Sequence, residues 1–266
     1  AGVANGFNAQ NAMINVVRLF ARSRRLIPQT AVLGSSAVGL ISGSSSANAA
    51  VVGTITIPLM KRYGVPATFA AVRQLSHLIR GEHPEATLVL LGHSWGSMIA
   101  QRILNKFSDE YDLAVLTGST LLLPGILPSG GFNKKFEAEA KKTGEQINGG
   151  AWLSRDLKVG EKFRADPLNF DETAIGVFGI ANVLGLLGTP SRKMPADIPI
   201  LLMAGSDDAI GGEKGNVMLL NAYKRAGLTD LELIIYDGGR HEVFNETNQD
   251  EVLADLVEWI DARLAD

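Results

Sequence analysis

The chain has 266 residues, of which 46% are hydrophobic and 20% are charged, and its formal net charge is −3. This length fits one large α/β domain or a smaller core with an appendage, and the mild negative charge argues against a nucleic-acid partner. The absence of Cys excludes disulfides, thiolate metal sites and cysteine catalysis. Only four His are present, which limits both metal sites and general bases. We expect neither a metal ion nor a cofactor.

The front of the chain lacks charge over a long stretch. No Asp, Glu, Lys or Arg occurs between Leu26 and Met60, where Ser, Gly and Ala predominate. Basic flanks and small residues suit a membrane-buried segment with broken helices, and a flexible Gly/Ser-rich segment is the alternative. Membrane association through residues 26–60 is therefore expected if this segment inserts.

The run VLGSSAVGLISGSSSANAAVVGTITIPLMKRYGVPATFAA resembles the fused membrane subunit of tripartite ATP-independent periplasmic transporters. The resemblance covers residues 1–72 and implies a fragment of the translocating core. The many spanning helices of a complete subunit are missing, so transport by this fragment alone is not expected. We place a domain boundary after residue 72.

From residue 73 the pattern changes to short apolar runs that alternate with amphipathic helices. Apolar strands alternating with helices predict an α/β fold with a parallel sheet covered on both faces. The predicted strands are 86–92, 112–118, 198–205 and 231–237, and the predicted helices are 97–107, 213–227 and 247–264. The last helix is expected to bury one face, which comprises Val252, Leu253, Leu256, Trp259 and Ile260.

The connection between the second and third strands is far longer than an ordinary loop. It runs from Leu121 to Pro195 and contains helical patches at 133–142 and 175–187. We interpret residues 121–195 as a helical cap over the strand ends.

The chemistry begins at Gly92-His93-Ser94-Trp95-Gly96, a G-x-S-x-G between a strand and a helix. A serine at such a turn is strained and exposed, and flanking glycines let the turn close. Ser94 is therefore the predicted nucleophile, and the alternative is a Gly-bounded loop with a helix-capping serine. His93 is expected to point away from the reaction and to pack or hydrogen-bond structurally.

A serine nucleophile needs a base and an orienting carboxylate, which follow the elbow in the order acid, then His. The third strand ends before Asp207 and Asp208, and the fourth leads to His241. Asp208 is preferred because the related pattern G-x-x-D-x-I/V places the acid two residues before an aliphatic. Asp207 is expected to cap or brace the loop.

Four motifs in order carry a second resemblance: GHSWGSM, AWLSRDLKVGEKFRADPLNFDET, LLMAGSDDAIGGEKG and YDGGRHEVFNETNQDEV. Together they resemble bacterial α/β-hydrolases of the lysophospholipase and monoacylglycerol lipase type. The resemblance covers residues 73–266 and implies hydrolysis of a carboxylic ester, such as that of a monoacyl lipid. We expect the hydrolase part to be cytoplasmic. The resemblance also implies an apolar acyl site in the cap, and the residues that would line it, or would simply form a buried helix face, are Phe178, Ile180, Val183 and Leu186.

The chain also departs from this family. An HG-type loop, which supplies one oxyanion donor, is missing before Ser94. The amide of Trp95 is the other expected donor. The transporter-like segment stands where the N-terminal strands belong, so we expect these strands to be replaced, with a junction near residues 71–73. The alternatives are a transporter fragment with a passenger and an inactive chimeric product.

Overall fold

The computed structural model describes residues 67–123, 131–144, 147, 149–166 and 179–264. The chain divides into two units, residues 1–86 and 87–266. In the first unit, the described part is helix α4 (Ala67–Glu82) and the residues that follow it to 86. The expectations for residues 1–66, including membrane association through 26–60, lie outside the described residues. The boundary expected after residue 72 stays a prediction.

The second unit is built on a four-stranded parallel sheet, in the order β1-β2-β3-β4. Its strands are β1 (Val89–His93), β2 (Leu113–Thr117), β3 (Ile200–Gly205) and β4 (Leu231–Tyr236). All four predicted strands are confirmed. Every residue of β2 and β3 is buried, as expected for central strands of a parallel sheet covered on both faces.

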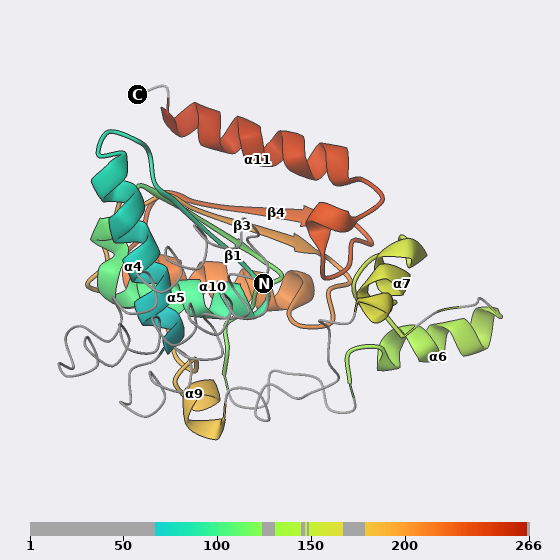
Figure 1. Cartoon of the computed structure of the whole chain (residues 1–266). Helices are drawn as coiled ribbons and strands as arrows, with labels where there is room; N and C mark the ends of the chain where they lie inside the picture. The colour runs from blue at the N-terminus through green and yellow to red at the C-terminus, as the bar shows by residue number, and fades with distance from the viewer. Residues whose placement is uncertain (1–66, 124–130, 145–146, 148, 167–178, 265–266) are drawn as a thin grey trace, which may run out of the picture. The chain divides into compact units, whose positions relative to one another are not determined.

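Helices cover both faces of this sheet (Figure 1), so the predicted layers are confirmed. Helices α5 (Trp95–Phe107) and α10 (Gly212–Ala226) lie on one face, and α11 (Gln249–Leu264) lies on the other. The buried cluster under α11 comprises Leu113, Val115, Leu201, Met203, Tyr236, Val243, Val252 and Trp259. This core includes residues of β3 and β4, the strands that lead to the loops of Asp208 and His241.

The prediction that Leu253 belongs to the buried face of α11 is wrong. Val252 and Trp259 are buried and Leu256 and Ile260 pack against the cluster, but Leu253 is 45% exposed. Successive helical residues are separated by about 100°, so Leu253 lies at the margin of the packed face, about 20° beyond Ile260.

The insertion between β2 and β3 contains helices α6 (Lys134–Thr143), α7 (Leu157–Ala165) and α9 (Ile180–Leu184). At its base, the amide of Gly188 donates to the carbonyl of Leu122 at 3.2 Å. The guanidinium of Arg102 on α5 donates to the carbonyls of Leu187 and Gly188. The two ends of the insertion are therefore tied together and to α5.

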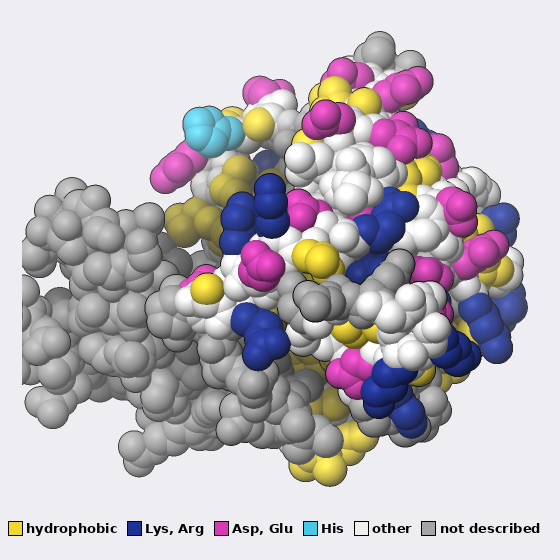
Figure 2. Space-filling view, turned by 90° about the vertical axis from the view of Figure 1, so that its right-hand side faces the viewer, with side chains coloured by type: hydrophobic (Ala, Val, Ile, Leu, Met, Phe, Trp, Pro, Cys, Tyr) yellow, Lys and Arg dark blue, Asp and Glu magenta, His cyan; other side chains and the backbone are white. Residues whose placement is uncertain are grey.

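Helices α6 and α7 lie beyond the ends of β3 and β4 (Figure 1). On the face of the molecule that they occupy, Lys and Arg side chains are interspersed with Asp and Glu (Figure 2). The described part of this unit also contains two short 3-10 helices, η1 (Ser108–Glu110) and η2 (Val243–Asn245). Among the described residues, no helix has both the length and the apolar character needed to cross a bilayer.

Strand β1 is an edge of the described sheet. It pairs with β2 and, within the described residues, with no other strand. Leu91 in the middle of β1 is 47% exposed, whereas its partner in register, Val115, is fully buried. The strand that leads to Ser94 therefore has an apolar side chain at the surface.

Candidate active site

Ser94 occupies a strained turn between β1 and α5. Its φ of 55° is the only positive φ among the described non-glycine residues. The turn is held because the amide of Ser94 donates to the carbonyl of Thr117 at 3.0 Å, and because Ser97 donates to the carbonyl of Ser94 from both its amide and its hydroxyl. Such local strain is typical of functional turns, and it leaves Ser94 only half-buried.

The two glycines of the elbow are not equivalent. A Cβ on Gly92 would lie 2.7 Å from the carbonyl oxygen of Gly96 and 2.9 Å from Ala100 Cβ, whereas a Cβ on Gly96 would meet nothing within 4 Å. The close approach of β1 to α5 therefore requires glycine at position 92. The expectation that both flanking glycines relieve clashes holds for Gly92 alone.

Asp208 and Asp207 face different surroundings. Asp208 Oδ1 accepts a hydrogen bond from the amide of Ile210 at 2.8 Å and lies 2.9 Å from His241 Nδ1, and the side chain is fully buried. Asp207 is partly exposed and pairs with Lys135 Nζ of α6 at 2.7 Å. The structure thus brings Asp208, and not its neighbour, to the histidine, while Asp207 braces the loop against helix α6 of the insertion.

Backbone contact brings the His241 loop to the end of β3. A Cβ on Gly205 would lie 2.1 Å from the carbonyl of Gly239, so the two segments contact each other through glycine backbone. The amide of Asp207 donates to the carbonyl of Gly239 at 2.9 Å. Gly239, two residues before His241, therefore lies in close backbone contact with the end of β3.

His241 connects the acid to the serine. Its Nε2 lies 2.8 Å from Ser94 Oγ and its Nδ1 lies 2.9 Å from Asp208 Oδ1, although Ser94 and His241 are 147 positions apart. His241 is only 1% exposed. The three residues chosen from the sequence form one continuous chain of hydrogen bonds.

His93 packs beside this chain. Its ring centroid lies 4.9 Å from that of His241, and its Nδ1 is 2.9 Å from Thr117 Oγ1. The structural hydrogen bond expected for His93 is therefore present, but its ring lies against the histidine of the site and does not point away. Burial, and secondarily the neighbouring His241, lowers the pKa of His93 to about 4, so its ring is neutral at neutral pH.

Trp152 of the insertion is a site residue that the sequence reasoning missed. Its ring lies 4.9 Å from that of His241, which it covers, and 4.8 Å from that of Phe132 on the insertion. The carbonyl of Trp152 also accepts a hydrogen bond from the amide of His241. The available signal was the AWLSRD motif, which supported the family resemblance without suggesting a role for its tryptophan.

The remaining predicted residues are less closely tied to Ser94. Trp95 begins α5 directly after it. Leu186 is buried, Val183 is half-buried and Ile180 is 62% exposed, while Phe178 lies outside the described residues. A role for Phe178, Val183 and Leu186 in substrate binding stays a prediction. Among the described residues, no group of three or more His, Asp or Glu side chains is arranged to hold a metal ion.

Comparison with known families gives two matches. Residues 61–248 match the family described as serine aminopeptidase, S33. Residues 3–75 match the DctM component of the tripartite ATP-independent periplasmic transporter. Both resemblances found in the sequence are confirmed, and the two matched ranges overlap at 61–75.

Individual proteins also resemble this chain. A monoacylglycerol lipase of Mycolicibacterium smegmatis is 31% identical over 202 residues, which are 72% of this chain and 68% of the relative. The structure of a Paleococcus ferrophilus monoacylglycerol lipase is similar with a TM-score of 0.52, at 24% identity over 73% of this chain and 75% of that chain. A Bacillus coagulans carboxyl esterase reaches a TM-score of 0.61, at 21% identity over 74% and 71% of the two chains. The two structures establish the α/β-hydrolase fold.

Proposed function

Because the chain belongs to the serine aminopeptidase S33 family of hydrolases, we propose that it cleaves carboxylic esters through Ser94, His241 and Asp208. The observation that carries the proposal is the unbroken line from Asp208 Oδ1 through both ring nitrogens of His241 to Ser94 Oγ. Such a line lets the imidazole take a proton from the hydroxyl while the carboxylate fixes its tautomer.

In the proposed reaction, Ser94 Oγ attacks the ester carbonyl carbon as its proton moves to His241 Nε2. The tetrahedral intermediate collapses when His241 returns that proton to the leaving alcohol, which leaves an acyl group on Ser94. Water then attacks the acyl carbon as its proton moves to His241 Nε2. His241 returns this proton to Ser94 Oγ as the bond to the acyl group breaks and the acid is released. The amide of Trp95, next to Ser94 at the start of α5, is the proposed oxyanion donor.

We propose a monoacyl glycerol ester as the substrate. The mycobacterial relative at 31% identity is a monoacylglycerol lipase, and its similarity spans most of this chain. The half-buried Ser94 and the buried His241, covered by Trp152, place the reacting groups under residues of the insertion. In this proposal an acyl chain lies along the insertion, and Val183 and Leu186 are candidate lining residues.

A fluorophosphonate probe and a monoacylglycerol assay test the proposal together. The wild-type chain should be labelled and should release fatty acid, and Ser94→Ala should abolish both. Labelling that survives in Ser94→Ala would remove Ser94 from the mechanism.

The two neighbouring aspartates supply a matched pair of variants. Asp208→Asn should lower turnover by about 10⁴-fold, the order of loss seen when an orienting carboxylate becomes an amide. Asp207→Asn removes only a partly exposed ion pair with Lys135 and should change turnover little. Equal losses in the two variants would reject Asp208 as the orienting acid.

A further inference from the structure

Glu246 has a fully buried carboxylate outside the proposed triad. Its Oε1 accepts from the amides of Arg155 at 3.0 Å and Arg240 at 2.8 Å. Its Oε2 accepts from Arg155 Nε at 2.8 Å and from the amide of Thr247 at 3.0 Å. Each oxygen therefore accepts two N–H donors, which satisfies a buried charge that would otherwise be costly.

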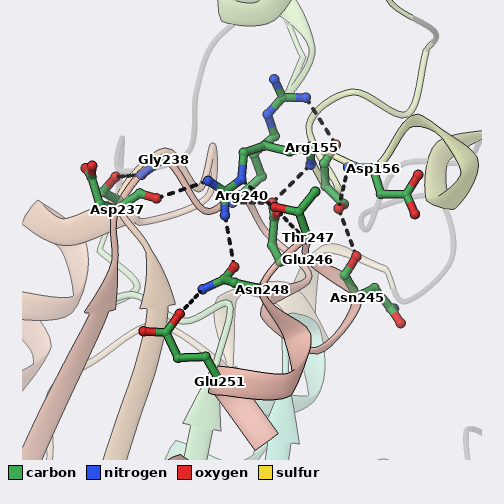
Figure 3. A network of polar contacts seen from close by, with 12 residues as sticks. Arg155, Asp156, Asp237, Gly238, Arg240, Asn245, Glu246, Thr247, Asn248 and Glu251 are labelled. Carbon is green, nitrogen blue, oxygen red and sulfur yellow. Dashed lines mark hydrogen bonds and ion pairs between the residues drawn. The ribbon is translucent and has the colours of Figure 1, made fainter.

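These donors come from two segments far apart in the sequence (Figure 3). Arg155 belongs to the insertion and lies between Trp152 and helix α7. Arg240 lies immediately before His241. The carboxylate of Glu246 thus joins the insertion to the loop that carries the proposed base.

The same two segments contact each other directly. The amides of His241 and Glu242 donate to the carbonyls of Trp152 at 3.3 Å and Leu153 at 2.7 Å. The guanidinium of Arg240 also donates to carbonyls of the insertion, those of Ala151 at 2.7 Å and Ser154 at 3.1 Å. Residues 151–155 and 240–242 are therefore held together by several hydrogen bonds, and the buried carboxylate of Glu246 contacts both segments.

We infer that Glu246 is a positioning residue, which holds the His241 loop against the insertion so that His241 Nε2 points at Ser94 and Trp152 covers the ring. The inference rests on the proposed roles of Ser94 and His241. Asp208 constrains only one edge of the imidazole, whereas Glu246 holds the amide before His241 and the carbonyls of Trp152 and Leu153 hold the amides of His241 and Glu242. Displacing a reacting group by about 1 Å can cost about 100-fold in rate.

Both acceptor oxygens of the Glu246 carboxylate are needed for this role. A glutamine at position 246 would keep the shape but would replace one acceptor oxygen by an NH₂ group. That group would face two N–H donors, either the Arg155 and Arg240 amides or Arg155 Nε and the Thr247 amide. Buried donors without an acceptor would push the two segments apart.

The test compares Glu246→Gln with Asp230→Asn. Asp230 also forms a paired contact with an arginine, Arg263, at 3.1 Å and 2.6 Å, and belongs to neither of the two joined segments. Fluorophosphonate labelling distinguishes a misplaced His241 from a misfolded chain. The end point of labelling gives the fraction of chains with a competent site, and the rate of labelling reports how well His241 activates Ser94. Glu246→Gln should slow labelling and kcat by on the order of 10-fold to 100-fold with an unchanged end point and a KM that changes much less. Asp230→Asn should retain the wild-type rate.

Hydrogen exchange supplies a readout that is independent of activity. Glu246→Gln should accelerate exchange together in peptides covering 151–155 and 240–242, and should leave the central strand β3 protected. If Glu246→Gln folds poorly, Arg155→Met removes one donor of the same carboxylate and should change labelling rate and exchange in the same direction by a smaller factor.

The outcomes are distinguishable. Slower labelling with joint loss of protection supports the inference. A Glu246→Gln variant that matches Asp230→Asn in both readouts overturns it while leaving the proposed function intact. Wild-type chain that is neither labelled nor active overturns the proposed function, and the exchange experiment alone then decides whether Glu246 joins the two segments.

Discussion

His93 precedes the proposed nucleophile and contacts the proposed base. Its ring is held between Thr117 Oγ1 and the ring of His241, in surroundings that favour the neutral form. Gly118 makes this packing possible, since a Cβ there would lie 2.8 Å from Cε1 of His241 and 2.9 Å from Cε1 of His93. A neutral ring beside His241 adds packing without adding a second positive charge when His241 is protonated during the reaction.

The lowered pKa of His93 predicts a pH dependence of stability. Its pKa is about 4 in the folded chain and about 6.5 when unfolded, so the unfolded state binds more protons between these values. Stability should therefore fall as pH drops from about 6.5 to about 4, by on the order of 2 kcal/mol from this residue. Thermal midpoints measured across this range should fall less steeply for His93→Gln, whose amide can still reach Thr117.

The control for this measurement is His83→Gln, at an exposed position of the first unit. It should retain the wild-type slope. A constant difference in midpoint between His93→Gln and wild type at all pH values would contradict the prediction.

At the scale of elements, the elbow depends on how closely β1 approaches α5. The geometry assigns this approach to Gly92, whose missing side chain leaves room for the Gly96 carbonyl and for Ala100. The contact between Gly205 and Gly239 likewise allows close approach of the end of β3 to the loop that carries His241. Two backbone approaches that only glycine permits therefore set the distances between the three proposed catalytic residues.

Gly92→Ala and Gly96→Ala should consequently behave differently. The first forces backbone atoms apart at the nucleophile turn, a kind of overpacking that costs about 1–3 kcal/mol, and should also slow labelling of Ser94. The second adds a methyl group to open space in a helix and should leave stability unchanged or slightly higher. Thermal midpoints and labelling rates of both variants check this, and similar losses in both would contradict the assignment.

At the scale of the molecule, the described sheet exposes β1. Leu91 lies on the same face as the core under α11, since it pairs in register with Val115, yet it is 47% exposed. Strand β1 has one described neighbour, and an edge strand with an exposed apolar side chain favours association between copies.

Leu91→Gln should therefore reduce concentration-dependent self-association while leaving the thermal midpoint near that of wild type. Light scattering across a concentration series measures the first effect. Val115→Gln, at the paired position on the same face, should instead unfold the chain, because it buries an amide in the core. Unchanged association in Leu91→Gln would contradict a role for this surface.

Much of the fold was predictable because its signals are local. Short apolar runs that alternate with helical periodicity indicated all four strands, and the G-x-S-x-G motif located the turn at Ser94. Chain order then suggested which histidine and which acid would follow. The fate of the N-terminal strands stays a prediction, because residues 1–66 lie outside the described part.

By itself, then, the sequence determined the parallel α/β architecture of the second unit, the family, and the candidates Ser94, Asp208 and His241. Only the tertiary structure showed that Asp208 reaches His241 while Asp207 turns to Lys135, and that Trp152 covers the histidine. The contact between Glu246 and Arg155, which are 91 positions apart, is likewise seen only in the tertiary structure. The physical reason is range: strand and turn patterns arise from neighbouring residues, whereas these contacts depend on how distant loops meet at the carboxyl ends of the strands.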